Sequence, residues 1–219
     1  MTLKSIMDKI QKELKTKEEA KEKVQKDMRK ALRLSKQAIL LTHQRRFNDA
    51  RKLLKESSKL LGELREVAEL HPDLVYTGIV AGANQEYSEA QVLLSLVREN
   101  RFMSPEKLDV PVVDYVLGLA DVIGEMRRQA LDSLRAGDLK RSEHYLEVME
   151  QIYVELLSMN ETYMLVHGLR RKCDIARRVI EATRGDLTLE ARRDSLEQSI
   201  GKLEKILGRK RKSGKSEKV

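Results

Sequence analysis

The stretch HPDLVYTGIVAGANQEYSEAQVLLSLVREN, residues 71–100, is almost uncharged in a chain of 219 residues of which 36% are charged. No lysine, arginine or histidine occurs between His71 and Arg98. Pro72 suits the first turn of a helix, and the apolar residues that follow recur three and four positions apart. Because a helix that is apolar on most sides has to avoid water, this stretch predicts a buried helix.

Six further helices are predicted around this stretch. Glycine and proline are absent from residues 1–61, which favours a long first helix. Asn48 is a suitable N-cap for the second helix, Pro111 opens the fourth, and Gly185 in the triplet RGD ends the sixth. The predicted helices cover about residues 3–44, 48–70, 72–100, 111–135, 139–158, 161–184 and 188–207. No segment alternates as a strand does, so the predicted fold class is all-α.

The seven helices are expected to form one domain over residues 1–206. The segment 207–219, LGRKRKSGKSEKV, is basic and contains glycine and serine, so it is expected to be a disordered tail. A single cysteine, Cys173, excludes an internal disulfide framework. An apolar run of membrane-spanning length and a signal-peptide pattern are both missing, which predicts a cytoplasmic protein with no membrane partner.

The net charge of +8 is unevenly distributed. Residues 1–65 contain 19 Lys and Arg against 9 Asp and Glu, a net charge of +10. Residues 66–206 contain 18 against 25, a net charge of −7, and residues 207–219 contain 6 against 1, a net charge of +5. This pattern suggests attraction for a polyanion in one region and for cations in another. Solvated helix faces with a solubilising tail are the simpler alternative.

Two pairs of acidic residues lie on predicted helix faces. Glu86 and Glu89 interrupt the apolar stripe of the buried helix, three positions apart. Asp121 and Glu125 lie four apart on the fourth helix, one turn after Gly118. Small residues at Gly82 and Gly118 allow two helices to approach closely, and packing of these helices against each other would bring all four carboxylates together.

Four such carboxylates, if buried without compensation, would repel one another by several kcal/mol, so they need protons or a cation. Oxygen ligands without histidine or cysteine suit magnesium, with manganese as the alternative. A pair of such ions can activate water and clamp a phosphodiester. The competing interpretation is that the acids form structural ion pairs with arginines such as Arg127, Arg128 or Arg177.

Other catalytic patterns are missing from the sequence. A ferritin-like di-iron site needs Glu-x-x-His, and none of the four histidines has a glutamate three positions before it. Glycine-rich phosphate loops, nucleophile elbows and zinc-binding spacings do not occur. The histidines are interpreted as structural or surface residues, and Cys173 as a packed one.

A line of basic residues is predicted on the first helix. Lys26, Arg29, Arg33 and Lys36 fall at helical spacing on one side, and such a line can follow a phosphate backbone. Because aromatic residues are almost absent nearby, base stacking would be weak and sequence preference low. A solvated lysine-rich helix is the alternative interpretation.

Three blocks of the chain resemble the translin superfamily. They are QEYSEA, VDYVLGLADVIGE and LRRKCDIARRVIEATRGDLT, in that order, and the resemblance covers about residues 25–190 and is strongest to the branch of translin-associated factor X. It implies a seven-helix protomer in a closed, barrel-like homo-oligomer, often an octamer, with a basic inner surface for single-stranded RNA or DNA. It also implies magnesium coordination by Glu86, Glu89, Asp121 and Glu125 for endoribonuclease cleavage.

The sequence thus favours a magnesium-dependent endoribonuclease that acts on single-stranded or processed RNA inside a homo-oligomer, with the four carboxylates as metal ligands. A non-catalytic oligomer of the translin type, which binds single-stranded RNA or DNA, is the first alternative. An all-α nucleotide pyrophosphohydrolase is the second. That class typically needs Glu-x-x-Glu followed by Glu-x-x-Asp, whereas the second pair here is Asp-x-x-x-Glu.

Overall fold

The computed structural model describes the backbone of residues 2–74, 77–159 and 162–216, and the side chains of these residues except 65, 66, 68 and 207–216. In this part of the chain all regular structure is helical, as predicted. The elements are α1 (Leu3–His43), α2 (Phe47–Leu70), the 3₁₀ helix η1 (Pro72–Leu74), α3 (Gly78–Glu99), α4 (Pro105–Leu108), α5 (Val112–Arg135), α6 (Leu139–Ser158) and α7 (Leu169–Ser216).

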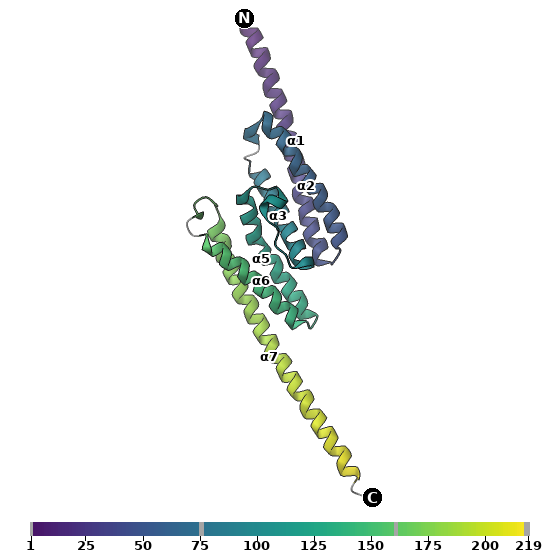
Figure 1. Cartoon of the computed structure of the whole chain (residues 1–219). Coiled ribbons are helices and arrows are strands. Elements are labelled where there is room, and N and C mark those ends of the chain that lie inside the picture. Colours follow the sequence, from purple (N-terminus) through teal and green to yellow (C-terminus); the bar gives the residue numbers. More distant parts are fainter. Residues whose placement is uncertain (1, 75–76, 160–161, 217–219) are drawn as a thin grey trace.

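Helix α3 lies at the centre of the molecule. It packs against α1 and α2 on one side and against α5 on the other, and α6 and α7 cover α5 (Figure 1). The side chains of Val92 and Leu93 in its middle are completely buried. Burial of an aliphatic side chain of this kind contributes about 1.5–3 kcal/mol. The almost uncharged stretch is therefore the buried helix that the sequence predicts, although it begins at Gly78 and Pro72 starts the separate helix η1.

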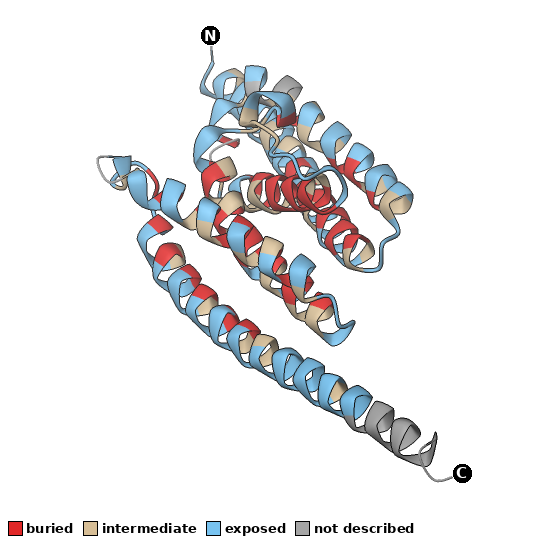
Figure 2. Cartoon of the chain, turned by 60° about the horizontal axis from the view of Figure 1, so that its bottom comes forward, coloured by how far each residue is buried: buried red, intermediate tan, exposed pale blue. Residues whose placement is uncertain are grey.

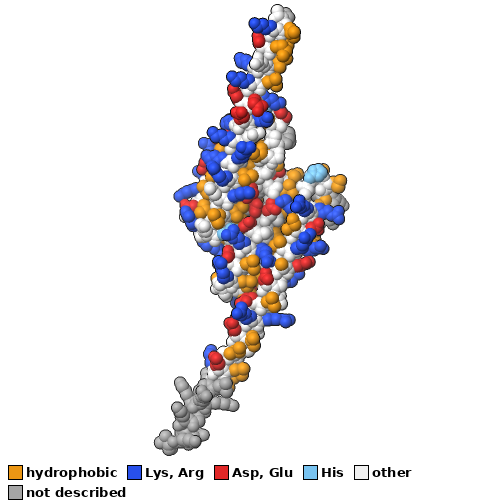
Figure 3. Space-filling model, turned by 180° about the vertical axis from the view of Figure 1, so that it is seen from behind, with side chains coloured by type: hydrophobic (Ala, Val, Ile, Leu, Met, Phe, Trp, Pro, Cys, Tyr) orange, Lys and Arg blue, Asp and Glu red, His pale blue; other side chains and the backbone are white. Residues whose placement is uncertain are grey.

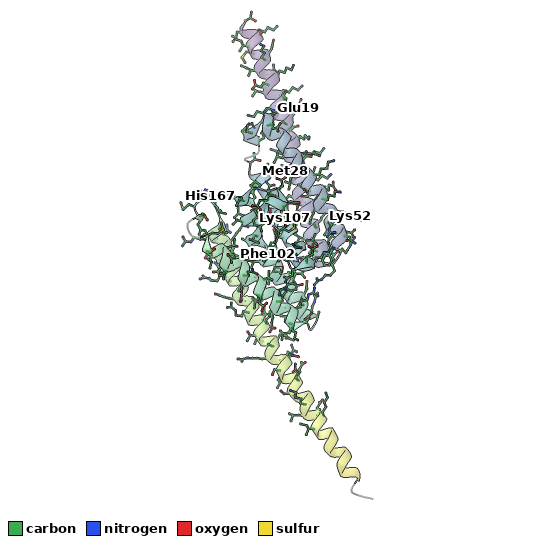
Figure 4. The ribbon with its side chains drawn as sticks, in the orientation of Figure 1. Glu19, Met28, Lys52, Phe102, Lys107 and His167 are labelled. Carbon is green, nitrogen blue, oxygen red and sulfur yellow. The ribbon has the colours of Figure 1, made fainter. Side chains whose placement is uncertain are left out.

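The two long helices extend beyond the bundle at opposite ends (Figure 1). Thr2 caps the N-terminus of α1, and its side chain accepts a hydrogen bond from the backbone N–H of Ser5. Figure 4 shows Met28 of α1 inside the bundle and Lys52 of α2 at its outer edge. Among the described side chains of α7, the last buried one is Leu187, and residues 188–206 are largely exposed (Figure 2).

The prediction of a helix end at Gly185 is wrong, because α7 continues through it. The side chains on both sides of Gly185 support an unbroken helix. Arg127 of α5 donates hydrogen bonds to Thr183 Oγ1 at 2.7 Å and to Asp186 Oδ2 at 3.1 Å. Arg184 forms an ion pair of 2.6 Å with Glu150 of α6. Residues of α5 and α6 therefore hold this part of the chain in a helical conformation.

Other predicted boundaries also differ. The sequence predicts the start of the sixth helix at residue 161, but α7 starts at Leu169. Gly168, with φ of +89°, lies in the turn before it. Residues 160–161 lie outside the described residues. Arg46, rather than Asn48, occupies the N-cap of α2. The loop at 100–111 contains the short helix α4.

The backbone remains helical to Ser216, where the sequence predicted a disordered tail from residue 207, and residues 217–219 lie outside the described residues. The domain limits at residues 1–206 stay a prediction. Within the described part of the chain, every helix is too short or too polar to span a lipid bilayer.

Replacing Gly185 with alanine is expected to stabilise the protein by about 0.5–1 kcal/mol, because alanine is a better helix former than glycine. An added Cβ at this position meets nothing within 4 Å. Urea unfolding of the two proteins measures the difference. A glycine in a left-handed cap would give the opposite sign, so destabilisation would contradict the unbroken α7.

Candidate active site

The helices α3 and α5 approach each other closely at Gly118. A Cβ added there would lie 2.5 Å from the backbone oxygen of Gln85, 3.0 Å from Ser88 Cβ and 3.1 Å from Glu89 N. The absence of a side chain therefore lets the two backbones touch beside Glu89. The sequence analysis placed Gly82 in the same contact. A Cβ added at Gly82 would instead lie 3.9 Å from Leu32 Cδ1 of α1.

The contact between α3 and α5 brings the four predicted carboxylates together. Glu89 is 8% exposed, and its burial raises the pKa of the carboxyl to about 9, with a further contribution from the charges of Asp121, Glu86 and Glu125 in that order. Burial likewise raises the pKa of Glu86, against the attraction of Lys36. The four carboxylates are thus one electrostatic group, which we call the acidic cluster.

Basic or histidine side chains from the two long helices contact three of these carboxylates. Lys172 Nζ of α7 lies 2.5 and 2.6 Å from the two oxygens of Asp121. His43 Nε2 of α1 lies 2.5 Å from Glu125 Oε2, and Lys36 Nζ of α1 lies 3.9 Å from Glu86 Oε2. Among the described residues, Glu89 has no hydrogen-bond or ion-pair partner. The least exposed acid of the cluster is therefore the one without a direct partner.

The arginines named in the sequence as ion-pair partners do not fill that role. Arg127 binds Thr183 and Asp186 of α7, and no ion pair with the cluster is found for Arg128 or Arg177 in the described part of the chain. The partners Lys172 and His43 were missed. Lys172 is one of several basic residues in LRRKCDIARR, and no pattern in the sequence distinguishes it from the others. His43 has a weak signal, because it is an ionisable residue at the end of the buried face of α1.

The donors of the acidic cluster match magnesium in kind, since all of them are carboxylate oxygens. In their present positions, however, no three acidic, histidine or cysteine side chains of the described residues form a group that could hold a metal ion. Lys172 contacts both oxygens of Asp121, and Glu125 is engaged by His43. Asp121 Oδ2 also accepts a hydrogen bond of 2.5 Å from Gln85 Nε2 of α3. A divalent cation would therefore have to displace Lys172, and Gln85 where it needs Oδ2, before Asp121 could coordinate it.

A fifth acid, Asp114, is buried like Glu89, and the sequence analysis did not predict it. Burial raises the pKa of Asp114, and Asn84 of α3 donates a hydrogen bond to its carboxylate at 3.1 Å. Asp114 also lies in the first turn of α5, where the helix dipole favours negative charge. With a partner and a helix terminus beside it, Asp114 is a structural acid.

The basic line of α1 leads to the acidic cluster. Lys26, Arg29, Arg33 and Lys36 are all exposed, and the first three line a hollow of about 420 Å³. Lys36, the last of them, makes the contact with Glu86. On the face seen in Figure 3, a group of acidic side chains near the middle of the molecule has basic side chains around it. A polyanion bound along α1 would therefore reach the carboxylates.

Comparisons with known proteins agree with the all-helical fold. An uncharacterized protein of Methanocaldococcus jannaschii is 36% identical over 142 residues, which are 64% of this chain and 61% of that protein. The solved structure of AfC3PO is 33% identical with a TM-score of 0.77, and its complex with duplex RNA is 32% identical with a TM-score of 0.76. Both alignments cover 84% of this chain and 96% of the other. Residues 19–207 match the translin family, and the chain belongs to that family.

Proposed function

We propose that this protein is a magnesium-dependent endoribonuclease that cleaves RNA within a homo-oligomer of the translin type. The observation that carries the proposal is Glu89, a carboxyl group 8% exposed, near three other acids and without a hydrogen-bond or ion-pair partner among the described residues. A buried group of this kind has a high energetic cost unless it serves a function or carries a proton. A divalent cation would remove that cost.

The residues of the chain would divide the work as follows. Glu86, Glu89, Asp121 and Glu125 would hold the ion, which supplies positive charge for phosphoryl oxygens and lowers the pKa of water. Lys172, once displaced from Asp121, would be free to contact a phosphate. The basic line on α1 would position the RNA backbone with its last member, Lys36, next to the acidic cluster.

The choice of RNA as substrate is supported by the relative AfC3PO, which was solved with duplex RNA. The sequence favours single-stranded or processed RNA, so both forms are needed as substrates. Purified protein should cut an end-labelled RNA at internal positions with magnesium and not with a chelator. Cleavage that continues in the chelator would contradict the role of the metal.

A non-catalytic RNA-binding oligomer is the second candidate. The observation in its favour is that Lys172 already contacts both oxygens of Asp121, and that the described side chains form no ready metal group. It predicts RNA binding that is unchanged by magnesium, with intact RNA after long incubation. Nothing in the comparisons supports a nucleotide pyrophosphohydrolase.

The oligomer is also part of the proposal, with eight chains as the favoured number. A closed barrel would enclose the basic line and the acidic cluster, so that RNA could reach them only inside. Light scattering coupled to size exclusion measures the assembly. A protein that stays at the monomer mass of 25.2 kDa would contradict it.

The double substitution Arg29→Gln and Arg33→Gln is expected to weaken RNA binding and to make it less dependent on salt. Each lost contact with a phosphate of a single strand lowers the slope of log affinity against log salt by about 0.7. Lys52→Gln with Lys59→Gln on α2 removes the same charge from residues 80% and 78% exposed, and is the control. Equal slopes for both double variants would mean that the basic line is only a solvated face.

A further inference from the structure

His43 is a buried histidine whose hydrogen bonds fix the position of its proton. Its side chain is 3% exposed and lies between Glu125 and Gln129 of α5. His43 Nδ1 is 2.8 Å from Gln129 Nε2, and His43 Nε2 is 2.5 Å from Glu125 Oε2. The tautomer of the ring follows from the atom of Gln129 that faces it.

Arg45 determines how the amide of Gln129 is oriented. Its guanidinium, which can only donate, lies 3.4 Å from Gln129 Oε1 and 3.5 Å from the hydroxyl of Tyr145. The oxygen of Gln129 therefore faces Arg45, and its NH₂ group donates to His43 Nδ1. With Nδ1 acting as an acceptor, the ring proton is on Nε2 and is donated to Glu125.

We propose that His43 is a positioning residue that orients the Glu125 carboxylate toward the acidic cluster as a neutral hydrogen-bond donor. The inference rests on the proposed function, because it concerns the way in which Glu125 is presented to a divalent cation. A neutral donor fixes the carboxylate without cancelling its charge, whereas a lysine at the same place would compete with the cation. Hydrogen bonds to metal-ligating groups act in this way and typically change metal affinity 10–100-fold.

Two substitutions of His43 test the roles of its two nitrogen atoms separately. A glutamine amide reaches as far as Nε2 and can still donate to Glu125, whereas an asparagine amide reaches only as far as Nδ1 and keeps the contact with Gln129 alone. His43→Asn is therefore expected to weaken magnesium binding about tenfold or more, measured by calorimetry without RNA. His43→Gln is expected to stay close to the wild type. His144→Asn, at an exposed histidine bonded to Asn100, is the control.

The magnesium concentration that gives half-maximal RNA cleavage should shift in parallel with the calorimetric affinity, at an unchanged maximal rate. Gln129→Met removes the donor to Nδ1 and should move both readouts in the same direction by a smaller factor. If urea unfolding shows that His43→Asn is not folded, Gln129→Met takes its place in the test. A wild-type affinity in both His43→Asn and Gln129→Met, or an equal loss in His43→Asn and His43→Gln, would overturn the inference alone. A wild-type protein that neither binds magnesium nor cleaves RNA would overturn the proposed function and this inference with it.

Discussion

Glu89→Gln is expected to lower magnesium-dependent RNA cleavage by at least about 100-fold while leaving the fold intact. Glutamine has the shape of glutamate, so the side chain occupies the same space and only the charge is lost. The cluster then offers three carboxylates in place of four, and catalytic effects of charge at this level are typically worth 10²–10³-fold. The measurement is the rate of cleavage of labelled RNA at saturating magnesium.

The same substitution should change how stability depends on pH. The pKa of Glu89 is raised from 4.5 to about 9 in the folded protein, so at intermediate pH the folded state holds a proton that the unfolded state has lost. Below pH 4.5 both states are protonated and the group has no effect. As the pH rises above 4.5, the metal-free wild type should lose stability by up to ~1.4 kcal/mol per pH unit, until about pH 9.

Glu89→Gln removes this pH dependence, so the variant should be the more stable protein at pH 8 and similar to the wild type at pH 4.5. Urea unfolding in a chelator at a series of pH values measures both curves. The exposed Glu143 on α6 is the matched site for a control Glu→Gln change, which should leave both cleavage and the pH curve unaltered. Parallel stability curves for Glu89→Gln and the wild type would show that the pKa of Glu89 is not raised in the folded protein.

Gly118→Ala is expected to destabilise the protein by about 1–3 kcal/mol and to abolish cleavage. The new Cβ would fall 2.5 Å from the backbone oxygen of Gln85, so α3 and α5 have to move apart. That movement separates Glu89 from Asp121, and displacements near 1 Å at an active site can cost about 10²-fold in rate. Urea unfolding and RNA cleavage are the two measurements.

Gly124→Ala, on the same helix, is the control for this substitution. A Cβ at Gly124 meets nothing within 4 Å, so the change should be neutral or stabilising by up to about 1 kcal/mol, with normal cleavage. Opposite signs at two glycines six residues apart are the expected result. A Gly118→Ala protein as stable and active as the wild type would mean that the close contact of α3 and α5 is not required.

The sequence predicts those helices whose limits depend on local patterns of residues. The uncharged stretch becomes α3, and the limits predicted for the helix at 139–158 agree with α6, whose cap Asp138 accepts a hydrogen bond from the backbone N–H of Arg141. Gly185 was misread because a glycine after an arginine is typical of a helix end. Contacts with distant parts of the chain override this local tendency. Arg127 donates hydrogen bonds to Thr183 and Asp186, and Glu150 pairs with Arg184.

The acidic cluster could be predicted in its members but not in its partners. Spacing along one helix places Glu86 next to Glu89, and a nearby glycine indicates where a second helix can approach. Which cation reaches which carboxylate depends on how α1 and α7 lie across the bundle, and no spacing within one helix contains that information. Lys172 and His43 lie more than 40 residues from the acids that they contact, with separations of 51 and 82 residues.

The most direct test of the metal site is a crystal structure of the protein grown with Mn²⁺, whose anomalous scattering locates the ion. We predict a peak between α3 and α5 within bonding distance of Glu89 and of at least two of Glu86, Asp121 and Glu125, with Lys172 withdrawn from Asp121. No peak at saturating Mn²⁺, with Lys172 still bound to both oxygens of Asp121, would contradict it.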